Sequence, residues 1–280
     1  MSYSMMNKNF PLFIIRYSLF IIPFCGQAAD NYPVGGRSAA LANASITITD
    51  LWACFNNQAA LAYLSKTTAG ASFDEQFAIS NLSTEGFALA LPTKAGTFGL
   101  SGNEFGYTAY NEKKVGLAFG KKLGEKISAG VQVDYLNTFI NDDFYGSKTT
   151  FAVEGGLLAE PIQNFKIGFH IFNPTRAKLA EYADERIPTI IRLGGSYKFS
   201  EKVWWSAEEE KDIDLPAVFK SGIEYHIVES LFLRVGVGTN PALFSFGFGL
   251  RVKQFTIDAA SVYYQVLGFS PSFSISYDFK

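Results

Sequence analysis

Residues 219–227 read Phe-Lys-Ser-Gly-Ile-Glu-Tyr-His-Ile, and this stretch decides the fold. Every second residue is apolar apart from one serine, and the residues between them are polar or glycine. In an extended strand, alternate side chains lie on opposite faces, so a period of two predicts a β-strand with one apolar and one polar face. The apolar face would hold Phe219, Ser221, Ile223, Tyr225 and Ile227.

The same alternation recurs through the chain after about residue 66. Residues 127–135, 165–172, 231–238 and 244–251 each alternate large apolar side chains with glycine, serine or isolated charges. Antiparallel sheets of soluble proteins also alternate, but their solvent faces carry more Lys, Glu and Thr. Here the apolar phase is rich in aromatics and free of charge in mid-strand, where a basic residue facing lipid would cost about 2–4 kcal/mol. The pattern therefore favours a transmembrane β-barrel over a soluble sandwich.

About fourteen such segments follow one another between residues 67 and 279. Short connections such as residues 93–95 and 122–124 mostly alternate with longer ones such as residues 103–110, 139–147 and 174–187. Outer-membrane barrels have short periplasmic turns and longer outer loops, and an even number of strands puts both chain ends in the periplasm. The predicted fold is all-β, a transmembrane antiparallel β-barrel of about fourteen strands with an N-terminal plug, in the outer membrane of a Gram-negative bacterium.

Residues 1–29 have the pattern of a signal peptide. Positively charged residues accompany an apolar run that ends near residue 24, and small residues follow it. The run is shorter and more interrupted than the about 20 apolar residues of a spanning helix. A lipoprotein signal ending at Cys25 is the alternative, and the bulky Phe24 argues against it. Cleavage near residue 29 would leave Cys54 alone, so the mature chain would form no internal disulfide.

Residues 30–66 lack the alternation, and we predict that they form a plug, or hatch, ahead of a barrel over residues 67–280. Residues 35–44 are small and apolar, and residues 50–61 look helical with Asp50 as the N-cap. A barrel of about fourteen strands has a lumen wider than its wall side chains can fill, and the plug would occupy it. Its candidate residues are Arg37, Asp50, Trp52, Phe55, Asn56 and Asn57.

Two short stretches in this region, GRSAAL at residues 36–41 and NNQAAL at residues 56–61, resemble the N-terminal signature of the PorV/PorQ family. That signature has a small-residue stretch, an acidic residue and then Asn-Pro-Ala before the first strand. Gln58 stands where the family has proline. The matching residues are Asp50, Asn57 and Ala59.

The last strand, within residues 267–279, also resembles the family, although Lys280 follows the final aromatic residue. The family is related to the FadL-type transporters of hydrophobic compounds. The resemblance implies a fourteen-stranded barrel with an N-terminal hatch. It also implies either accessory work in type IX protein secretion or uptake of hydrophobic molecules.

The polar phase of the strands would face the lumen, and it carries charges of both signs. We expect ion pairs across the interior, with Arg37 paired to one of the carboxylates; gating of a ligand or partner is the functional alternative. The two histidines lie on separate strands without a cysteine or carboxylate set at ligand spacing, so we predict no metal site and no cofactor. The candidate lumen residues are Glu154, Lys166, His170, Arg192, Glu224, His226, Arg234, Arg251 and Asp258.

Three features concern the ends of the barrel. The charged run over residues 208–214 reads as a solvated outer loop, because like charges in a run repel and stay hydrated. Of the pair Trp204 and Trp205, the outward Trp205 fits an interfacial aromatic girdle. The longest outer loop, residues 174–187, is the leading candidate for contact with a partner.

The sequence indicates no enzyme and no nucleic-acid partner. The formal net charge is −2, and the chain has no phosphate-binding glycine loop, nucleophile elbow or Cys/His cluster. The main prediction is an accessory protein of secretion that contacts secretion-system components or secreted cargo. One alternative is a FadL-like transporter with an apolar pocket for a hydrophobic small molecule, lined by Trp52, Phe55 and Phe172. The other is a purely structural barrel in outer-membrane lipid.

Overall fold

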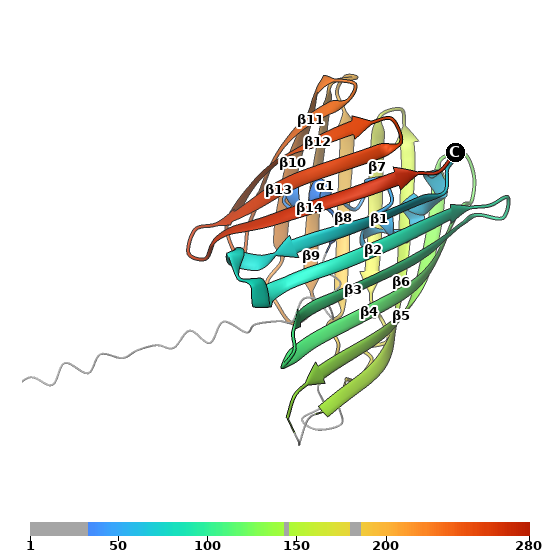
Figure 1. Ribbon diagram of the computed structural model, residues 1–280. Coiled ribbons are helices and arrows are strands. Elements are labelled where there is room, and N and C mark those ends of the chain that lie inside the picture. The colour runs from blue at the N-terminus through green and yellow to red at the C-terminus, as the bar shows by residue number, and fades with distance from the viewer. Residues whose placement is uncertain (1–32, 143–145, 180–185) are drawn as a thin grey trace, which may run out of the picture.

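The computed structural model describes residues 33–142, 146–179 and 186–280, and the predicted signal peptide lies outside these ranges. The chain forms a closed barrel of antiparallel strands that pair in sequence order (Figure 1), which confirms the predicted fold class. β1 closes the ring on β14, from Thr68 opposite Asp278 to Asp74 opposite Ser272. The strands are β1 (Thr68–Glu75), β2 (Ser83–Pro92), β3 (Thr97–Tyr107), β4 (Tyr110–Lys122), β5 (Ile127–Ile140), β6 (Gly146–Ile162), β7 (Phe165–Phe172), β8 (Ile190–Lys198), β9 (Val203–Asp212), β10 (Val218–Val228), β11 (Leu231–Gly238), β12 (Leu243–Val252), β13 (Phe255–Tyr264) and β14 (Gly268–Asp278).

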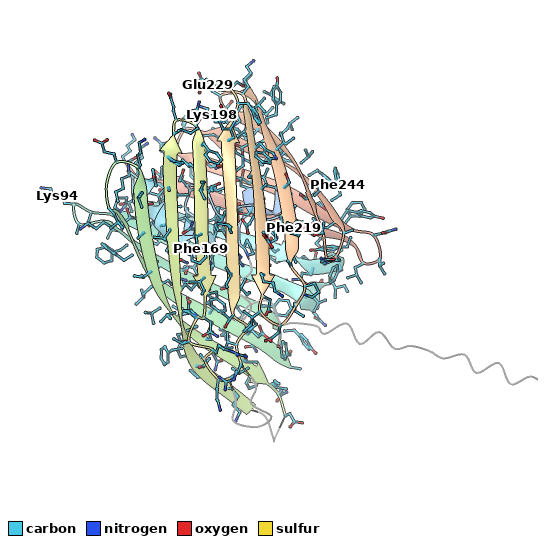
Figure 2. The ribbon with its side chains drawn as sticks, turned by 180° about the vertical axis from the view of Figure 1, so that it is seen from behind. Lys94, Phe169, Lys198, Phe219, Glu229 and Phe244 are labelled. Atoms are coloured by element: carbon cyan, nitrogen blue, oxygen red, sulfur yellow. The ribbon has the colours of Figure 1, made fainter. Side chains whose placement is uncertain are left out.

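The two faces of each strand follow the predicted alternation. In β10, Phe219 and Ile223 are exposed on the outside, whereas Lys220 and Glu224 are buried inside. Figure 2 shows the same outward placement for Phe219 and for Phe169 of β7. Charged residues inside and large apolar residues outside are the reverse of a soluble protein, and they match a wall that faces lipid.

The end of the barrel where β1 begins and β14 ends is called the inner end here, and the opposite end is the outer end. Turns at the inner end are short, as between β10 and β11, whereas the connection from β7 to β8 at the outer end is long. Charged Lys198, the last residue of β8, and Glu229, on the β10–β11 turn, lie at the inner end (Figure 2). This asymmetry assigns the inner end to the periplasm.

Aromatic side chains ring the inner end of the wall. Ring centroids lie 4.8 Å apart for Phe255 and Tyr277 and 4.9 Å apart for Phe98 and Phe119. Aromatic girdles of this kind flank the apolar band of outer-membrane barrels. Trp205 also faces outward, where its Nε1 donates to Ser221 Oγ at 3.0 Å. No helix among the described residues is long and apolar enough to cross a membrane.

The prediction of a longer loop at residues 103–110 is wrong. β3 and β4 continue to a tight turn, with Tyr107 opposite Tyr110. The hydropathy signal fades there because the outward positions become polar, as in the ion pair of 3.3 Å between Lys113 Nζ and Glu104 Oε1. The pairing of the two strands nevertheless continues, since backbone hydrogen bonds do not depend on which side chains face outward.

The solvated loop predicted at residues 208–214 is also wrong in its first half. β9 runs to Asp212, so the acidic run alternates between the two faces of a strand. Glu208 is 3% exposed and faces the lumen, whereas Glu209 faces outward. Consecutive acidic residues are tolerated for two reasons. The pleat of the strand places neighbouring side chains on opposite faces, and basic residues on the adjoining strands compensate the charge of the acidic residues that point inward.

The single helix predicted over residues 50–61 is two short helices, α2 (Ala53–Asn56) and η1 (Gln58–Tyr63). Asn57 breaks them with an extended backbone (φ −165°, ψ 107°). Asp50 lies before a turn, and its Oδ1 accepts the Trp52 N–H at 3.0 Å rather than capping α2. Asn57 makes the break stable because its amide bonds the wall and the following turn, as described below.

Candidate functional site

Residues 33–64, called the N-terminal segment, lie inside the barrel. The segment includes α1 (Gly36–Ala40), α2 and η1, and most of its residues are buried. It makes hydrogen bonds to inward side chains on opposite sides of the ring, so it crosses the lumen. These bonds join Gly36 N to Ser274 Oγ (3.0 Å), Ala42 N to Ser245 Oγ (2.8 Å), Ser45 N to Glu208 Oε2 (2.9 Å) and Ser128 Oγ to Ala59 O (2.9 Å).

Wall glycines let the N-terminal segment approach the strands closely. A Cβ atom at Gly130 would lie 2.3 Å from the carbonyl carbon of Gln58, and one at Gly222 would lie 2.8 Å from Leu41 Cβ. Contacts this short do not occur between real side chains. The glycine in the inward phase of these strands therefore makes room for the backbone of the segment.

Three polar clusters join the segment to the wall, and the first, the inner cluster, centres on Glu224. Arg37 of α1 donates to it from Nε at 2.8 Å and from Nη2 at 2.9 Å. Arg234 of β11 donates to Glu224 at 2.6 Å and to Asp258 of β13 at 2.6 Å. The carboxylate is thus shared by one arginine of the segment and one of the wall. Asp50 Oδ2 lies 3.5 Å from Arg37 Nη1.

Burial and charge act in opposite directions on the two segment residues of the inner cluster. Burial disfavours the charge of Arg37, but the carboxylates of Glu224 and Asp50 outweigh it and raise the pKa of Arg37. Burial raises the pKa of Asp50, and the nearby guanidinium of Arg37 offsets this only in part. Arg37 is therefore a fixed cation, and Glu224 is its principal partner.

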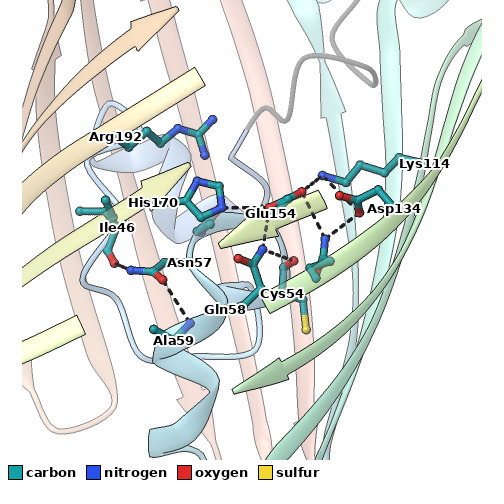
Figure 3. Close-up of polar contacts among 12 residues, drawn as sticks. Ile46, Cys54, Asn57, Gln58, Ala59, Lys114, Asp134, Glu154, His170 and Arg192 are labelled. Carbon is teal, nitrogen blue, oxygen red and sulfur yellow. Dashed lines mark hydrogen bonds and ion pairs between the residues drawn. The ribbon is translucent and has the colours of Figure 1, made fainter. Parts of the chain in front are cut away.

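The central cluster gathers around Glu154 of β6 (Figure 3). Gln58 Nε2 of the segment donates to Glu154 Oε2 at 2.7 Å, and His170 Nε2 lies 2.9 Å from the same oxygen. Lys114 of β4 forms an ion pair with Glu154 and lies 3.7 Å from Asp134. These partners compensate the negative charge of the buried carboxylate. Loss of one partner would leave part of that charge uncompensated in apolar surroundings.

Asn57 fastens the break between α2 and η1 (Figure 3). Its Nδ2 donates to Ile46 O at 2.9 Å and to Leu157 O of β6 at 3.2 Å. Its Oδ1 accepts the Ala59 N–H at 3.1 Å. Asn56 Nδ2 donates to Ser38 Oγ at 2.9 Å, which joins α2 to α1. The two asparagines therefore hold the segment in its folded form.

The third cluster, the outer cluster, lies on β8–β10. Glu208 Oε2 accepts the backbone N–H groups of Ser45 and Ile46, both at 2.9 Å. Glu210 accepts from Arg192 Nε at 2.7 Å and from Lys220 Nζ at 2.8 Å. Glu208 thus binds the segment, and Arg192 and Lys220 of the wall balance the charge of the neighbouring Glu210.

The predicted lumen residues all lie on the inner face of the wall, but they fall into separate groups. Glu154, His170 and Arg192 belong to the central and outer clusters, and Glu224, His226, Arg234 and Asp258 to the inner cluster. Lys166 lies 4.9 Å from the Tyr63 ring, and Arg251 lies 5.4 Å from the Phe232 ring. The two histidines contact different carboxylates. Within the part of the chain that is described, no group of three His, Cys, Asp or Glu residues is placed to hold a metal ion.

Several cluster members escaped the sequence prediction. Gln58, Lys114, Asp134, Glu208 and Lys220 are all at most 8% exposed and contact the segment or its partners. The sequence could have indicated in part that these residues face the lumen, since each of them that belongs to a strand lies in the inward phase of that strand. The sequence could not indicate which residue each of them contacts, because pairing across the lumen depends on strand curvature and on the path of the segment.

Two cavities flank the segment. The first, the inner vestibule, is about 1030 Å³ and is lined by residues of the inner cluster, by Glu201 and Glu229 of inner-end turns, and by Arg251 and Asp278 near the inner ends of β12 and β14. The second, the outer pocket, has a volume of only about 40 Å³ and lies under the β1–β2 and β13–β14 connections. It is bounded by Val34 and Ala39 of the segment and by wall residues that include Phe77, Val262 and Tyr264.

The pocket predicted between Trp52, Phe55 and Phe172 is not formed by these three residues together. Trp52 and Phe55 stack with ring centroids 6.5 Å apart in one buried cluster. Phe172 packs in a separate cluster with Leu136 and Ile190. Phe172 instead stacks beneath Lys114, whose Nζ lies 5.0 Å from the ring centroid. Aromatic content alone could not show which side of the segment each ring would meet.

A closed ring of fourteen strands, a lipid-facing apolar band and a charged interior define a transmembrane β-barrel of the Gram-negative outer membrane. No protein-family profile matches the chain, and no curated protein matches it. Among solved structures it is similar to the toluene transporter TodX of P. putida, with TM-score 0.69 and 13% identity over 90% of this chain and 99% of that one.

Two further solved structures have the same fold. A FadL homologue of Pseudomonas aeruginosa gives TM-score 0.64 and 14% identity over 88% of this chain and 98% of its own. The toluene transporter TbuX of Ralstonia pickettii gives TM-score 0.65 and 13% identity over 88% and 98%. At these identities the likeness establishes a FadL-like barrel fold. None of the three is described as a PorV/PorQ or secretion protein, so that assignment stays a prediction.

Proposed function

We propose that this barrel carries small hydrophobic molecules across the outer membrane, and that the N-terminal segment is a plug that closes its lumen. The observation that carries the proposal is the arrangement of the two cavities. A pocket with an apolar wall lies on the outer side of the segment, and a polar vestibule lies on its periplasmic side. A hydrophobic molecule would enter the first and leave through the second when the segment shifts.

The outer pocket is small in this closed form, and its apolar wall would receive such a molecule once a shift of the segment enlarges it. Phe77 and Tyr264 meet edge to face with ring centroids 5.4 Å apart, and the Phe77 N–H donates to Ser270 Oγ at 2.9 Å. The two rings therefore form a fixed apolar wall. Pockets for small molecules usually have apolar walls and a few polar groups.

The fold comparison supports the same proposal. Two of the solved structures that share the fold are toluene transporters. The secretion role, by contrast, rests on the short N-terminal and C-terminal resemblances alone. A transport role also agrees with the lumen, whose polar groups bind the segment.

Toluene binding to the purified, detergent-solubilised barrel tests the proposal. We expect saturable binding that weakens by about tenfold in Phe77→Ala, because truncating a large apolar ring removes roughly 1–3 kcal/mol of contact. Phe169→Ala removes an equally large ring from the lipid face and is the matched control. Binding that is absent, or that is equal in all three proteins, would contradict the proposal.

A further inference from the structure

A group of three exposed lysines lies at the inner rim of β2–β5 and is called the lysine patch. Lys94 is on the β2–β3 turn and projects away from the barrel (Figure 2), Lys121 is near the inner end of β4, and Lys126 is on the β4–β5 turn. The two turns are neighbours, because Thr97 of β3 lies opposite Gly120 of β4. None of the three ammonium groups forms an ion pair with a carboxylate among the described residues.

Lys121 continues the lipid-facing side of β4. Two residues before it is Phe119, whose ring centroid lies 4.9 Å from that of Phe98 in the inner aromatic girdle. Leu117, two residues earlier again, is 66% exposed on the outside of the wall. Side chains two residues apart share one face of a strand, so Lys121 points outward one step beyond the girdle. Girdle aromatics mark the level of the headgroups, so the Lys121 ammonium lies among the headgroups of the periplasmic leaflet.

The surroundings of the patch carry an excess of positive charge. The two turns and the end of β4 that meets them contain four lysines and one acidic residue, Glu125. The fourth lysine, Lys122, faces the lumen, where its Nζ lies 4.5 Å from the centroid of the Tyr63 ring. Lys126 Nζ donates to Pro161 O at 2.8 Å and keeps two further N–H groups for another acceptor. The patch therefore presents positive charge and unused hydrogen-bond donors beside an apolar wall.

Other parts of the inner rim differ in charge. Lys198 Nζ at the end of β8 lies 2.6 Å from Glu201 Oε2, so its charge is already balanced. The β10–β11 turn carries Glu229 and no basic residue. An anion in the membrane would therefore meet more attraction at the lysine patch than at these two turns.

We propose that the lysine patch binds the headgroup of an anionic phospholipid in the periplasmic leaflet, with the acyl chains along Phe98 and Phe119. This proposal goes beyond the transport function and concerns the lipid-facing surface of the wall. The headgroup phosphate accepts hydrogen bonds from ammonium groups, and each lysine near an anionic membrane surface raises affinity by about fivefold. A zwitterionic phospholipid gains less, because its own cationic group offsets the attraction. The girdle directly beneath the lysines favours a lipid over an acidic protein, since it places Lys121 at headgroup depth.

Native mass spectrometry of the purified full-length barrel tests the proposal. The fraction of barrel that carries a lipid is measured at rising concentrations of phosphatidylglycerol and of phosphatidylcholine with the same acyl chains. We expect phosphatidylglycerol to bind at least about fivefold more tightly. An excess of inorganic phosphate should leave it bound, because free phosphate has no acyl chains to pack on the wall. Complete displacement by inorganic phosphate would overturn the proposal. Equal affinity for the two lipids would do the same, and it would point to an acidic protein as the partner of the patch.

Two variants test the lysines themselves. Lys121→Gln should weaken phosphatidylglycerol binding by about fivefold, and the double variant with Lys94→Gln should weaken it by at least about tenfold. Binding of phosphatidylcholine should change by less than about twofold in both. Lys198→Gln is the matched control, because it removes a lysine at the same end of the barrel that is already paired, and it should keep the native affinity.

The shift between boiled and unboiled samples on gels shows that each variant is folded. An equal loss of affinity in Lys121→Gln and Lys198→Gln would mean that net charge alone attracts the lipid, which contradicts a site at the patch. A native affinity for phosphatidylglycerol in the folded double variant would contradict it as well.

Discussion

Glu224 is the residue at which the N-terminal segment and the wall depend most directly on each other. It accepts from Arg37 of the segment and from Arg234 of the wall, and it is 2% exposed. Removing one member of a buried ion pair destabilises strongly, by about 3–5 kcal/mol, because the remaining charge stays buried. Arg37 would keep Asp50, 3.5 Å away, as its nearest partner of opposite charge among the described residues of the cluster.

Glu224→Gln should therefore loosen the segment while the barrel stays closed. Cys54 reports this, since it belongs to α2 of the segment and is fully buried. In a Cys25→Ser background we expect the rate of maleimide labelling to rise at least tenfold over the unaltered Glu224 protein. Glu201→Gln, which changes an exposed turn residue paired to Lys198, should leave the rate unchanged. Equal rates in both variants would show that Glu224 does not hold the segment.

The same cysteine gives a prediction about pH. Burial raises the pKa of the Cys54 thiol to about 12. A free thiol with its ordinary pKa of about 8.5 forms thiolate progressively as the pH rises from about 7 to about 9. Cys54 should stay protonated over this range, so alkylation should remain slow at pH 9 in the native protein and become fast only after denaturation. Rapid alkylation of the native protein at pH 9 would contradict the burial of α2.

At the scale of elements, the N-terminal segment shows where local sequence ceases to suffice. The small residues at 35–44 and the apolar run at 50–61 were enough to predict that this part differs from the strands. They were not enough to predict a break at Asn57, because its bonds to Ile46 and Leu157 exist only once the segment lies against β6. A tertiary contact here overrides helix propensity.

Gly130→Val tests the fit between segment and wall. A Cβ atom at this position collides with Gln58, and overpacking of this kind costs about 1–3 kcal/mol. We expect faster Cys54 labelling and an increased ionic conductance in planar bilayers, while the heat-modified gel shift is retained. Val131→Leu, one residue along and facing lipid, should behave like the native protein. A native conductance and labelling rate in Gly130→Val would contradict the close packing of Gln58 on β5.

At the scale of the whole molecule, the fourteen strands were predictable because a wall between lipid and lumen imposes a period of two on every strand. The prediction failed where that contrast ends, at the polar outer tips of β3 and β4 and in the acidic second half of β9. The inward phase identified Glu154, Arg192 and Glu224. Their partners could not be predicted, because they come from strands and turns brought together only by closure of the ring.

The lipid-facing band gives a prediction that concerns the whole barrel. Val235 is outward-facing in the middle of β11. Val235→Lys should cost about 2–4 kcal/mol near mid-membrane depth, which reduces the folded fraction in bilayers at intermediate urea. Val235→Ile should leave the urea midpoint nearly unchanged. An equal midpoint for the lysine variant would mean that this face does not contact lipid.

Uptake of labelled toluene by intact cells tests the central claim most directly. The comparison is between a strain lacking this protein, the same strain carrying the native chain, and the same strain carrying Phe77→Ala. The native chain should raise the initial rate of toluene entry several-fold at low external concentration, and Phe77→Ala should lose most of that gain although it reaches the outer membrane in equal amount. Identical rates in all three strains would contradict a role in the passage of hydrophobic molecules.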